Sequence, residues 1–367
     1  MKLVFTGGHH SSALPIIDEL KSRYPDSEIY WIGHKFSLRN DTNETLEYKE
    51  ITARQIPFYE LKTGKVYRVY NPLILAKVLS GFVRAYSLLK EIKPDIIVSF
   101  GGYLAAPVVV AAYFQNIPSV THEQTLVVGY ANKVISLFAK KILLSWESSK
   151  QYFKNNKTVV TGIPLRKEIF KVNSSVFNAN NNLPYIFILG GKSGSHVLNS
   201  VVLEALPTLL SKYNVIHQCG DYSVYNDSAQ AENKYAHIKS SVPGVYFAKK
   251  FILEHEIGEA YNKAAVVVSR SGAHTIAEIL ALHKRALFIP IPWVSHNEQN
   301  INANYVVEKG LARVLKEEGL SAESLTKEIE LTLNEINPSK ITETLISLDA
   351  PSLIVNEIIS TVKDKKN

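Results

Sequence analysis

Short apolar runs recur along the whole chain, and stretches with helical spacing separate many of them. The runs are KLVF, EIYWIG, DIIVSF, SVTHE and KILLSW in the first half, and YIFILG, VIHQCG, GVYFA, AVVVSR and ALFIPIP in the second. Continuous Val, Ile, Leu and Phe runs that alternate with helices of about a dozen residues are typical of a parallel sheet covered on both faces. The pattern predicts an α/β protein.

The two halves of the chain resemble each other. KLVFTGGHHSSALPIIDEL near the start has a counterpart in YIFILGGKSGSHVLNSVVLEAL, because each reads as a strand, two glycines, small polar residues and a helix. DIIVSFGGYLAAPVVVAA and AVVVSRSGAHTIAEILAL form a second such pair. This repetition predicts two Rossmann-like domains that face each other across a cleft.

The length of 367 residues suits two domains of roughly 150 to 200 residues each. We place the boundary after Arg166, because the Asn-rich stretch 178–182 that follows has no periodic apolar face. The expected domains are residues 1–166 and 167–345. A final helix around Ser352 to Val362, within residues 346–367, is able to pack back on the first domain.

Composition excludes several classes of protein. The hydrophobic fraction of 46% and charged fraction of 20% are those of a folded chain. The longest apolar run, Leu104 to Phe114, is too short to cross a bilayer, and the amino terminus reaches glycine before a signal-peptide core forms. The single cysteine, Cys219, allows no internal disulfide. No His, Cys and Asp cluster has metal-ligand spacing, so we predict no metal and no cofactor.

The net charge of +7 predicts an anionic partner. From Glu60 to Lys93 there are seven basic residues against two acids, and from Lys133 to Lys157 there are six lysines against Glu147 alone. No recognition motif supports nucleic acid as that partner.

Four glycine turns, two in each half, follow expected strands. Such a turn brings backbone amides and the positive end of a helix dipole close to an anion, and diphosphate suits that geometry. The alternative is that the glycines only permit tight turns. GGHHSS and GGKSGS lack the G-x-G-x-x-G spacing of dinucleotide sites, and no Walker lysine loop is present, so NAD and ATP are disfavoured.

The segment SRSGAHTIAEILAL carries the most specific signal. Ser271, Gly272 and Thr275 stand at the start of a helix, where hydroxyls and amides can hold phosphate. Glu278 lies about one turn further on, where a carboxylate can accept hydrogen bonds from a ribose diol. Ordinary helix capping beside an ordinary helix acid explains the same residues, and both interpretations stay open.

Together these segments resemble the MurG family. The matching stretches are TGGH, PDIIVSFGGYLAAP, THEQTLVVGYANK, TGIPLR, ILGGKSGSHVLN, SRSGAHTIAEI and NEQNINA, in the family's order from residue 6 to about residue 303. The resemblance implies a GT-B glycosyltransferase of peptidoglycan synthesis. It would move N-acetylglucosamine, with inversion, from UDP-N-acetylglucosamine to undecaprenyl-diphosphoryl-N-acetylmuramoyl-pentapeptide (lipid I) at the cytoplasmic face of the membrane.

The resemblance also implies roles for residues of the second domain. Glu278 would hold the ribose, Ile252 would lie near the uracil and Gln299 on the sugar. Ser271, Gly272 and Thr275 would lie near the diphosphate, which Arg166 would approach with its planar fork. The other candidates there are Lys192, Ser193, Gly194, Ala273, His274, Ile276 and Ala277. Lys192 stands where the family usually has serine.

In the first domain the resemblance points to a general base. His9 matches the histidine that ends the family's first glycine turn, and imidazole titrates in a useful range for deprotonating an acceptor hydroxyl. The family's turn, Gly-Gly-Thr-Gly-Gly-His, is three residues longer. If the chain is instead aligned on Pro15 without a gap, Ser12, whose hydroxyl is a poor base, falls at the position of the family's histidine. His10 is the alternative base candidate. The substrate-binding candidates of this domain are Thr6, Gly7, Gly8, His10, Ser12, Glu123, Thr125 and Asn132.

Two residues near these candidates have alternative roles. Glu123 is either an acceptor contact or a second base candidate, whereas His122 fits hydrogen-bonded scaffolding better than catalysis. Thr125 stands where the family has asparagine, so the polar side chain at this position has a shorter reach.

The stretch from Asn71 to Ile92 is amphipathic at helical spacing and lies in the first basic cluster. Leu75, Leu79 and Phe82 could enter a membrane interface while lysines meet anionic head groups. A helix packed on the sheet explains the apolar face equally well. Two other functions fit the same fold: a UDP-sugar 2-epimerase and a non-catalytic sugar-nucleotide-binding partner.

Overall fold

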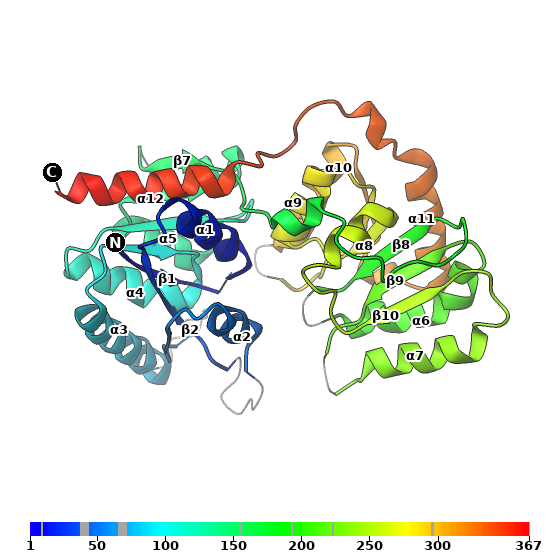
Figure 1. Ribbon diagram of the computed structural model, residues 1–367, viewed down its shortest axis with the longest axis horizontal. Coiled ribbons are helices and arrows are strands. Elements are labelled where there is room, and N and C mark those ends of the chain that lie inside the picture. Colours follow the sequence, from blue (N-terminus) through cyan, green and yellow to red (C-terminus); the bar gives the residue numbers. More distant parts are fainter. Residues whose placement is uncertain are drawn as a thin grey trace. The chain divides into compact units, whose positions relative to one another are not determined.

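The computed structural model describes residues 1–8, 10–36, 44–64, 72–153, 156–191, 194–221, 224–294 and 297–366 (Figure 1). The chain divides into two compact units. The N-terminal unit consists of Met1–Leu165 and Ser347–Asn367, and the C-terminal unit consists of Arg166–Ile346.

The N-terminal unit is built on a sheet of seven parallel strands in the order β3-β2-β1-β4-β5-β6-β7. The strands are β1 (Lys2–Thr6), β2 (Glu28–Gly33), β3 (Phe58–Glu60), β4 (Ile96–Ser99), β5 (Ser119–Glu123), β6 (Lys141–Leu144) and β7 (Thr158–Val160). The strand order reverses between β1 and β4. In open parallel sheets ligands bind beyond the carboxyl ends of strands at such a reversal.

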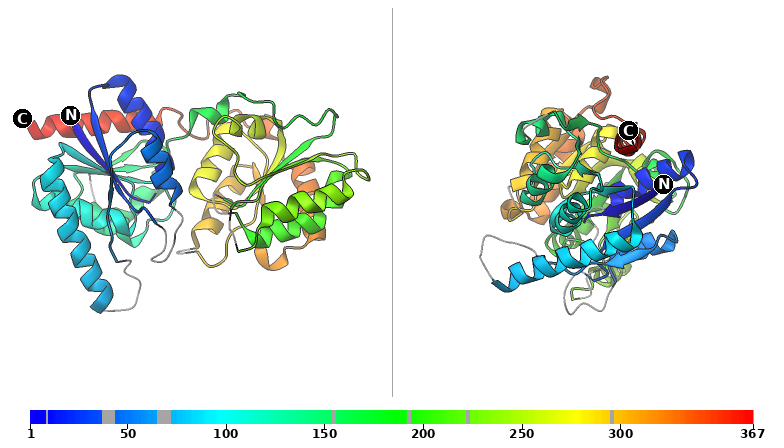
Figure 2. Two further views of the ribbon diagram at one scale, coloured as in Figure 1. Left: turned by 60° about the horizontal axis from the view of Figure 1, so that its bottom comes forward. Right: turned by 90° about the vertical axis from the view of Figure 1, so that its left-hand side faces the viewer.

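Helices cover both faces of this sheet (Figure 2). They are α1 (His10–Arg23), α2 (Leu46–Ala53), α3 (Pro72–Ile92), α4 (Gly102–Phe114), α5 (Tyr130–Phe138), the 3-10 helix η1 (Glu147–Tyr152) and α12 (Ala350–Lys366). Side chains of β1 alternate between the faces, as a strand requires. Leu3 and Phe5 are buried with residues of α1 and α12, whereas Val4 is buried with residues of α3, α4 and α5.

The carboxyl-terminal helix α12 packs on the N-terminal unit although it follows the C-terminal unit in sequence (Figure 1). Ile354 and Ile358 belong to the same buried cluster as Leu3. The Lys141 ammonium lies 2.6 Å from Glu357 Oε2 of this helix, and Arg23 Nη2 donates to Asn356 Oδ1 at 2.7 Å.

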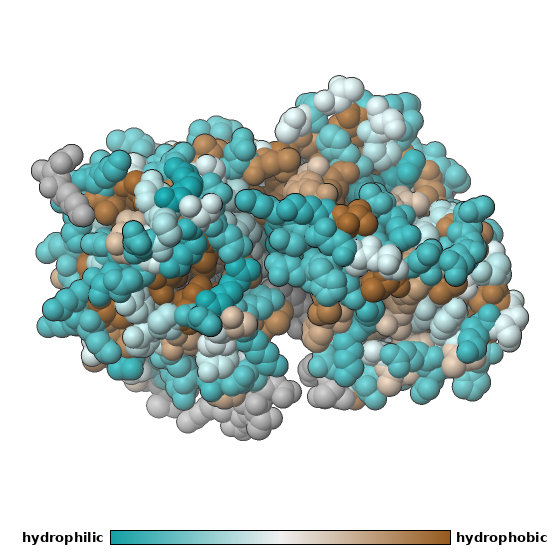
Figure 3. All heavy atoms as spheres, in the orientation of Figure 1, coloured by the Kyte–Doolittle hydropathy of each residue, from teal (hydrophilic) through white to brown (hydrophobic). Residues whose placement is uncertain are grey.

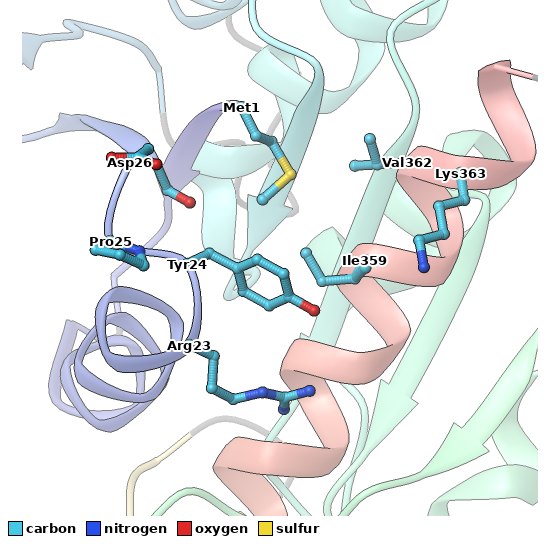
Figure 4. A pocket seen from close by; sticks show the side chains of 9 residues that line it. Met1, Arg23, Tyr24, Pro25, Asp26, Ile359, Val362 and Lys363 are labelled. Carbon is cyan, nitrogen blue, oxygen red and sulfur yellow. The ribbon is translucent and has the colours of Figure 1, made fainter.

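A cavity of about 390 Å³ lies between α12 and the segment that joins α1 to β2 (Figure 4). Its lining includes Met1, Tyr24, Asp26, Ile359 and Lys363. Met1 and Ser27 directly precede β1 and β2, so this cavity lies at the amino ends of those strands. The glycine turns follow the opposite ends.

The C-terminal unit repeats the plan with six parallel strands in the order β10-β9-β8-β11-β12-β13. The strands are β8 (Tyr185–Leu189), β9 (Asn214–Gln218), β10 (Tyr246–Lys249), β11 (Ala264–Ser269), β12 (Ala286–Phe288) and β13 (Ala312–Val314). The helices are η2 (Lys167–Phe170), α6 (His196–Leu210), α7 (Asp227–Ile238), α8 (Ile257–Lys263), α9 (Ala273–Leu282), α10 (Glu298–Glu308), η4 (Glu317–Gly319), α11 (Ala322–Glu335) and η5 (Pro338–Lys340). Ile186 and Ile188 of β8 are buried with α6 and α11, whereas Phe187 packs on Tyr261 of α8.

These two doubly wound sheets confirm the predicted α/β fold with two Rossmann-like domains. The sequence did not predict α2 or the three-residue strands β3 and β13, and both of these strands lie at a sheet edge. Short edge strands are a common way to limit pairing with other chains.

Hydrophilic side chains cover most of the face shown in Figure 3, and hydrophobic side chains form scattered patches on it. Cys219 is a free thiol that is buried, and burial raises its pKa to about 12. Of the helices in the described ranges, none has the length and apolar character that a bilayer crossing needs.

Candidate active site

The first glycine turn joins β1 to α1. Thr6 ends β1 and is completely buried, and Gly7 and Gly8 follow. Gly7 has φ of 124°, and a Cβ atom there would lie 2.9 Å from the carbonyl oxygen of Gly101. The turn therefore packs directly on the second glycine turn, which joins β4 to α4. Both turns lie at the strand reversal, where an anion can approach backbone amides. His9, the predicted base, lies outside the described residues.

The two alternatives to His9 occupy the first turns of α1. His10 is buried, and its Nε2 lies 2.7 Å from Oε2 of Glu50 on α2. Ser12 is completely buried and donates from Oγ to Oε1 of Gln124 at 2.8 Å. A base must reach the hydroxyl that it deprotonates, so the burial of Ser12 argues against that role.

Glu123, at the end of β5, is the centre of a buried polar cluster. Oε1 accepts from the backbone N–H of Thr125 at 3.0 Å and lies 2.7 Å from the Thr125 hydroxyl, and Oε2 accepts from Nδ2 of Asn132 on α5 at 2.7 Å. Burial raises the pKa of Glu123, and these hydrogen bonds oppose the shift. A Cβ at Gly101 would lie 2.1 Å from Asn132 Oδ1, so the cluster adjoins the second glycine turn. The structure thus brings Glu123, Thr125 and Asn132 together.

His122 lies in the interior of the same unit. It is buried, and its Nε2 lies 2.9 Å from the carbonyl oxygen of Gly162. This geometry agrees with a scaffolding role, because the imidazole links β5 to the segment that follows β7.

In the C-terminal unit, Arg166 and Glu278 form an ion pair. Arg166 Nη2 lies 3.0 Å from Glu278 Oε1, and the Tyr261 hydroxyl donates to Glu278 Oε2 at 2.6 Å. Glu278 is buried on α9, while Arg166 is half-buried just before η2. Burial alone would lower the pKa of Arg166, but the charge and the hydrogen bond of Glu278 raise it. Arg166 therefore stays charged beside the carboxylate.

The start of α9 is open to an anion. Gly272 is the N-cap residue and supplies no side-chain capping bond. The first backbone N–H groups of this ten-residue helix are therefore not capped by the N-cap side chain and can donate to an anion. Ser271 is buried and donates from Oγ to the carbonyl oxygen of Gln299 at 2.7 Å. Gln299 Oε1 in turn accepts from the N–H of Ile291 at 3.0 Å. The structure therefore joins Ser271 and Gln299 at one site.

The other candidates on α9 fall into two groups. Ala273, His274 and Thr275 in its first turn are half-buried. Ile276 and Ala277 are completely buried, so their side chains belong to the helix face that packs in the core.

Gln218, at the end of β9, connects the turn between β8 and α6 with Ile252, one of the predicted positions. Its Nε2 donates to the carbonyl oxygen of Gly191, and its Oε1 accepts from the N–H of Ile252 at 2.9 Å. Gly194 has φ of 79°, and a Cβ there would lie 2.0 Å from the carbonyl oxygen of Cys219. Lys192 and Ser193 lie outside the described residues.

Sequence reasoning missed Gln218, Tyr261 and Arg270. Arg270 is buried, donates to Ser195 Oγ at 2.7 Å and to the carbonyl oxygen of Ile289 at 2.8 Å, and pairs with Glu317. It therefore joins the ends of β11 and β12 to the N-cap residue of α6 and to η4. A charged residue directly after an apolar strand was the available signal for it.

Within the described ranges, no group of three or more His, Cys, Asp or Glu side chains is placed to hold a metal ion. The arrangement offers helix amides, hydroxyls, one arginine and one carboxylate instead. These groups can hold an anion beside a diol.

Two parallel sheets with glycine turns at the reversals of strand order define the GT-B type of fold. The N-terminal domain of glycosyltransferase family 28 matches residues 5–144, and its C-terminal domain matches residues 185–348. A UDP-N-acetylglucosamine–N-acetylmuramyl-(pentapeptide) pyrophosphoryl-undecaprenol N-acetylglucosamine transferase of Clostridium perfringens strain ATCC 13124 is 34% identical and covers 93% of this chain and 94% of its own. The enzyme of the same name from Clostridium botulinum strain Alaska E43 is 31% identical over 99% of both chains.

Solved structures give the same picture. The crystal structure of MurG from Acinetobacter baumannii has a TM-score of 0.70 and 25% identity, and covers 98% of this chain and all of its own. UDP-GlcNAc 2-epimerase from Neisseria meningitidis, solved with UDP-GlcNAc, has a TM-score of 0.62 at 16% identity over 98% of this chain and all of its own, which shows a shared fold. The chain belongs to glycosyltransferase family 28 and, within it, to the MurG family. The predicted resemblance and the enzyme class are confirmed.

Proposed function

We propose that this chain transfers N-acetylglucosamine from UDP-N-acetylglucosamine to lipid I and so forms lipid II in peptidoglycan synthesis. The relatives carry the name of this reaction. The observation that carries the proposal is the buried Glu278 carboxylate one turn beyond the uncapped amides of α9. That pair of features suits a ribose diol joined to a diphosphate.

The C-terminal unit would hold the donor. Glu278 accepts hydrogen bonds from the ribose hydroxyls, and the first amides of α9 with Ser271 and Thr275 hold the diphosphate. Arg166 lies beside Glu278 and reaches phosphate oxygens with its second guanidinium edge. Ile252 lies near the uracil and Gln299 on the sugar. We also assign Gly194, in the turn before α6, to the anion site, together with Lys192 and Ser193, which precede it in the sequence.

The N-terminal unit would hold the acceptor. The paired glycine turns offer backbone amides to the acceptor diphosphate, since they meet at the strand reversal. Glu123 with Thr125 and Asn132 contacts the acceptor beside the second turn. Glu123 is the second base candidate, and it ranks behind His9 because its carboxylate is buried and both oxygens accept hydrogen bonds.

His9 is the proposed base, and His10 is its alternative. The acceptor oxygen attacks the anomeric carbon of N-acetylglucosamine while the bond from that carbon to the diphosphate oxygen breaks. The proton of the acceptor hydroxyl passes to the imidazole, and UDP leaves with the electron pair of the broken bond. The α9 dipole and Arg166 stabilise the charge that develops on UDP. Attack on the face opposite the leaving group inverts the anomeric configuration.

The acceptor carries a lipid, so the enzyme would work at an anionic membrane surface on the cytoplasmic side. On α3, Leu75 is 69% exposed and Leu79 is 63% exposed, beside the exposed cations Lys77 and Arg84. Exposed apolar residues beside cations suit a peripheral membrane contact. Phe82 differs from the expectation, because it is half-buried and packs edge-on against Phe114 at 6.1 Å.

An assay with labelled UDP-N-acetylglucosamine and a lipid I analogue tests the proposal. We expect label in the lipid product. Inversion at C2 of the donor sugar without transfer would identify an epimerase, the function of several proteins that share this fold. Binding without either reaction would identify a non-catalytic sugar-nucleotide-binding protein.

A further inference from the structure

Tyr261 is buried against the carboxylate that the proposed donor site uses. It lies on α8, is completely buried, and its ring packs edge-on against Phe187 of β8 with 5.3 Å between centroids. Its hydroxyl donates to Glu278 Oε2 at 2.6 Å. Burial raises the pKa of Tyr261 well above its usual value, so the hydroxyl keeps its proton and stays a donor.

The second carboxylate oxygen is held from another element. Arg166 Nη2 lies 3.0 Å from Glu278 Oε1, so donors from α8 and from the residue before η2 hold the two oxygens separately. Each carboxylate oxygen accepts about two hydrogen bonds, so each keeps room for one more. One acceptor position on each of the two oxygens of a single carboxylate suits the two hydroxyls of a cis-diol.

The terminal torsion of a glutamate is soft, and a carboxylate without a second anchor turns easily toward its strongest partner. Without the Tyr261 hydroxyl, Glu278 would be free to turn both oxygens toward Arg166 and away from a diol. We propose that Tyr261 is a positioning residue that fixes the plane of Glu278 and thereby sets the preference of the site for ribonucleotides over 2′-deoxyribonucleotides. This inference rests on the proposed function, in which Glu278 binds the donor ribose.

Calorimetric titration of the full chain with UDP and with 2′-deoxy-UDP tests the inference. We expect the wild type to bind UDP about tenfold more tightly, because a hydrogen bond to a charged carboxylate is lost with the 2′-hydroxyl. Tyr261→Phe removes one oxygen atom and keeps the ring. We expect the ratio of the UDP affinity to the 2′-deoxy-UDP affinity to fall to about twofold in this variant, mainly through weaker binding of UDP. In the transfer assay the same variant should raise KM for the donor more than it lowers kcat.

Tyr246→Phe is the matched control. Tyr246 is also buried, but it lies on the edge strand β10 and its hydroxyl lies 2.7 Å from His217 Nδ1. This variant should keep the wild-type ratio. Because both ligands are titrated into one sample, a loss of folded protein cancels from the ratio.

A double-mutant cycle with Glu278→Gln separates positioning from general stability. If Tyr261 acts through Glu278, adding Tyr261→Phe to Glu278→Gln should leave the ratio unchanged. A Tyr261→Phe variant with the wild-type ratio would overturn the inference and leave the donor site intact. A wild type that binds UDP and 2′-deoxy-UDP equally would instead overturn the proposed ribose contact itself.

Discussion

Single residues carry the chemistry that we assign to the N-terminal unit. His10 is held by Glu50 and Ser12 by Gln124, so both contribute to the packing of α1. His9 precedes them in the sequence and is the base that we propose. A base near neutral pKa is needed because the acceptor hydroxyl is not acidic.

Replacement of His9 by alanine should lower kcat by about 100-fold, since general base catalysis typically contributes at least that factor. The KM for UDP-N-acetylglucosamine should stay near the wild-type value, because the donor contacts lie in the other unit. Steady-state transfer kinetics measure both constants. Undiminished transfer by the variant would reject His9 as the base.

Glu123 should make the stability of the N-terminal unit depend on pH. Its pKa in the folded protein is raised, so the folded state holds this proton more tightly than the unfolded chain does. The stabilisation is complete below the ordinary carboxyl range and is lost as pH rises through the raised pKa. The melting temperature of the wild type should therefore fall, relative to Glu123→Gln, as pH rises from 4 upward.

The Glu123→Gln variant can keep its hydrogen bonds. Asn132 Oδ1 has no hydrogen-bond partner among the described residues, so a flip of this amide would let it accept from the new glutamine. Glu147→Gln, which removes an exposed carboxyl of the same unit, is the control. A difference in melting temperature that rises with pH would contradict the assigned direction.

At the scale of elements, a buried network joins β9, β10, α6 and α7. His217 Nε2 lies 3.0 Å from Asn199 Oδ1, and its Nδ1 lies 2.7 Å from the Tyr246 hydroxyl. Asn199 Nδ2 donates to Asp227 Oδ2, which leaves Asn199 Oδ1 to accept from His217. These roles suit a neutral imidazole protonated on Nε2, and burial lowers the pKa of His217 to about 4.

This network should make the C-terminal unit sensitive to acid. The folded pKa of His217 lies below its ordinary value of 6.5, so the stabilisation is present above pH 6.5 and is lost as pH falls toward 4. A shift of this size corresponds to about 3 kcal/mol of unfolding free energy. Urea unfolding at several pH values across this range should show that the unfolding free energy of His217→Gln declines less steeply with falling pH than that of the wild type. Exposed His237→Gln is the control, and equal slopes for all three proteins would contradict the account.

The turn between β8 and α6 requires glycine at position 194. Both its positive φ and the 2.0 Å distance from an added Cβ to the Cys219 carbonyl oxygen exclude a side chain. Gly194→Ala should lower the unfolding free energy by more than about 1 kcal/mol. Gly319→Ala, where no atom lies within 4 Å of the added Cβ, should have a much smaller effect. Denaturant titration compares the two, and equal losses would show that the turn tolerates a side chain.

At the scale of the whole molecule, we propose that α3 mediates the contact with the membrane surface. Leu79→Glu should reduce binding to vesicles that contain anionic lipid by about tenfold, because it places a charge in the apolar contact. Ser87→Glu adds the same charge at another exposed position of α3 and should have a smaller effect. Co-sedimentation with vesicles measures both variants. Equal losses would show that net charge alone governs the contact.

Much of the fold was predictable because its signals are local. Long apolar runs and glycine turns predict the central strands and the repeated plan of the two halves, whereas the edge strands β3 and β13 are short and show no periodicity. The partners of the site residues are not local. Arg166 and Tyr261 stand 112 and 17 residues from Glu278, and Gln124 stands 112 residues from Ser12. A single sequence carries no sign of such pairs, so the polar clusters needed the structure.

The anomeric configuration of the transferred sugar tests the central claim most directly. The purified chain would be supplied with UDP-N-acetylglucosamine and a lipid I analogue, and the new glycosidic bond would be examined by NMR. Direct displacement by an acceptor hydroxyl with base assistance predicts a β-linked N-acetylglucosamine formed from the α-linked donor. An α-linked product, or release of free sugar without any lipid product, would contradict the account.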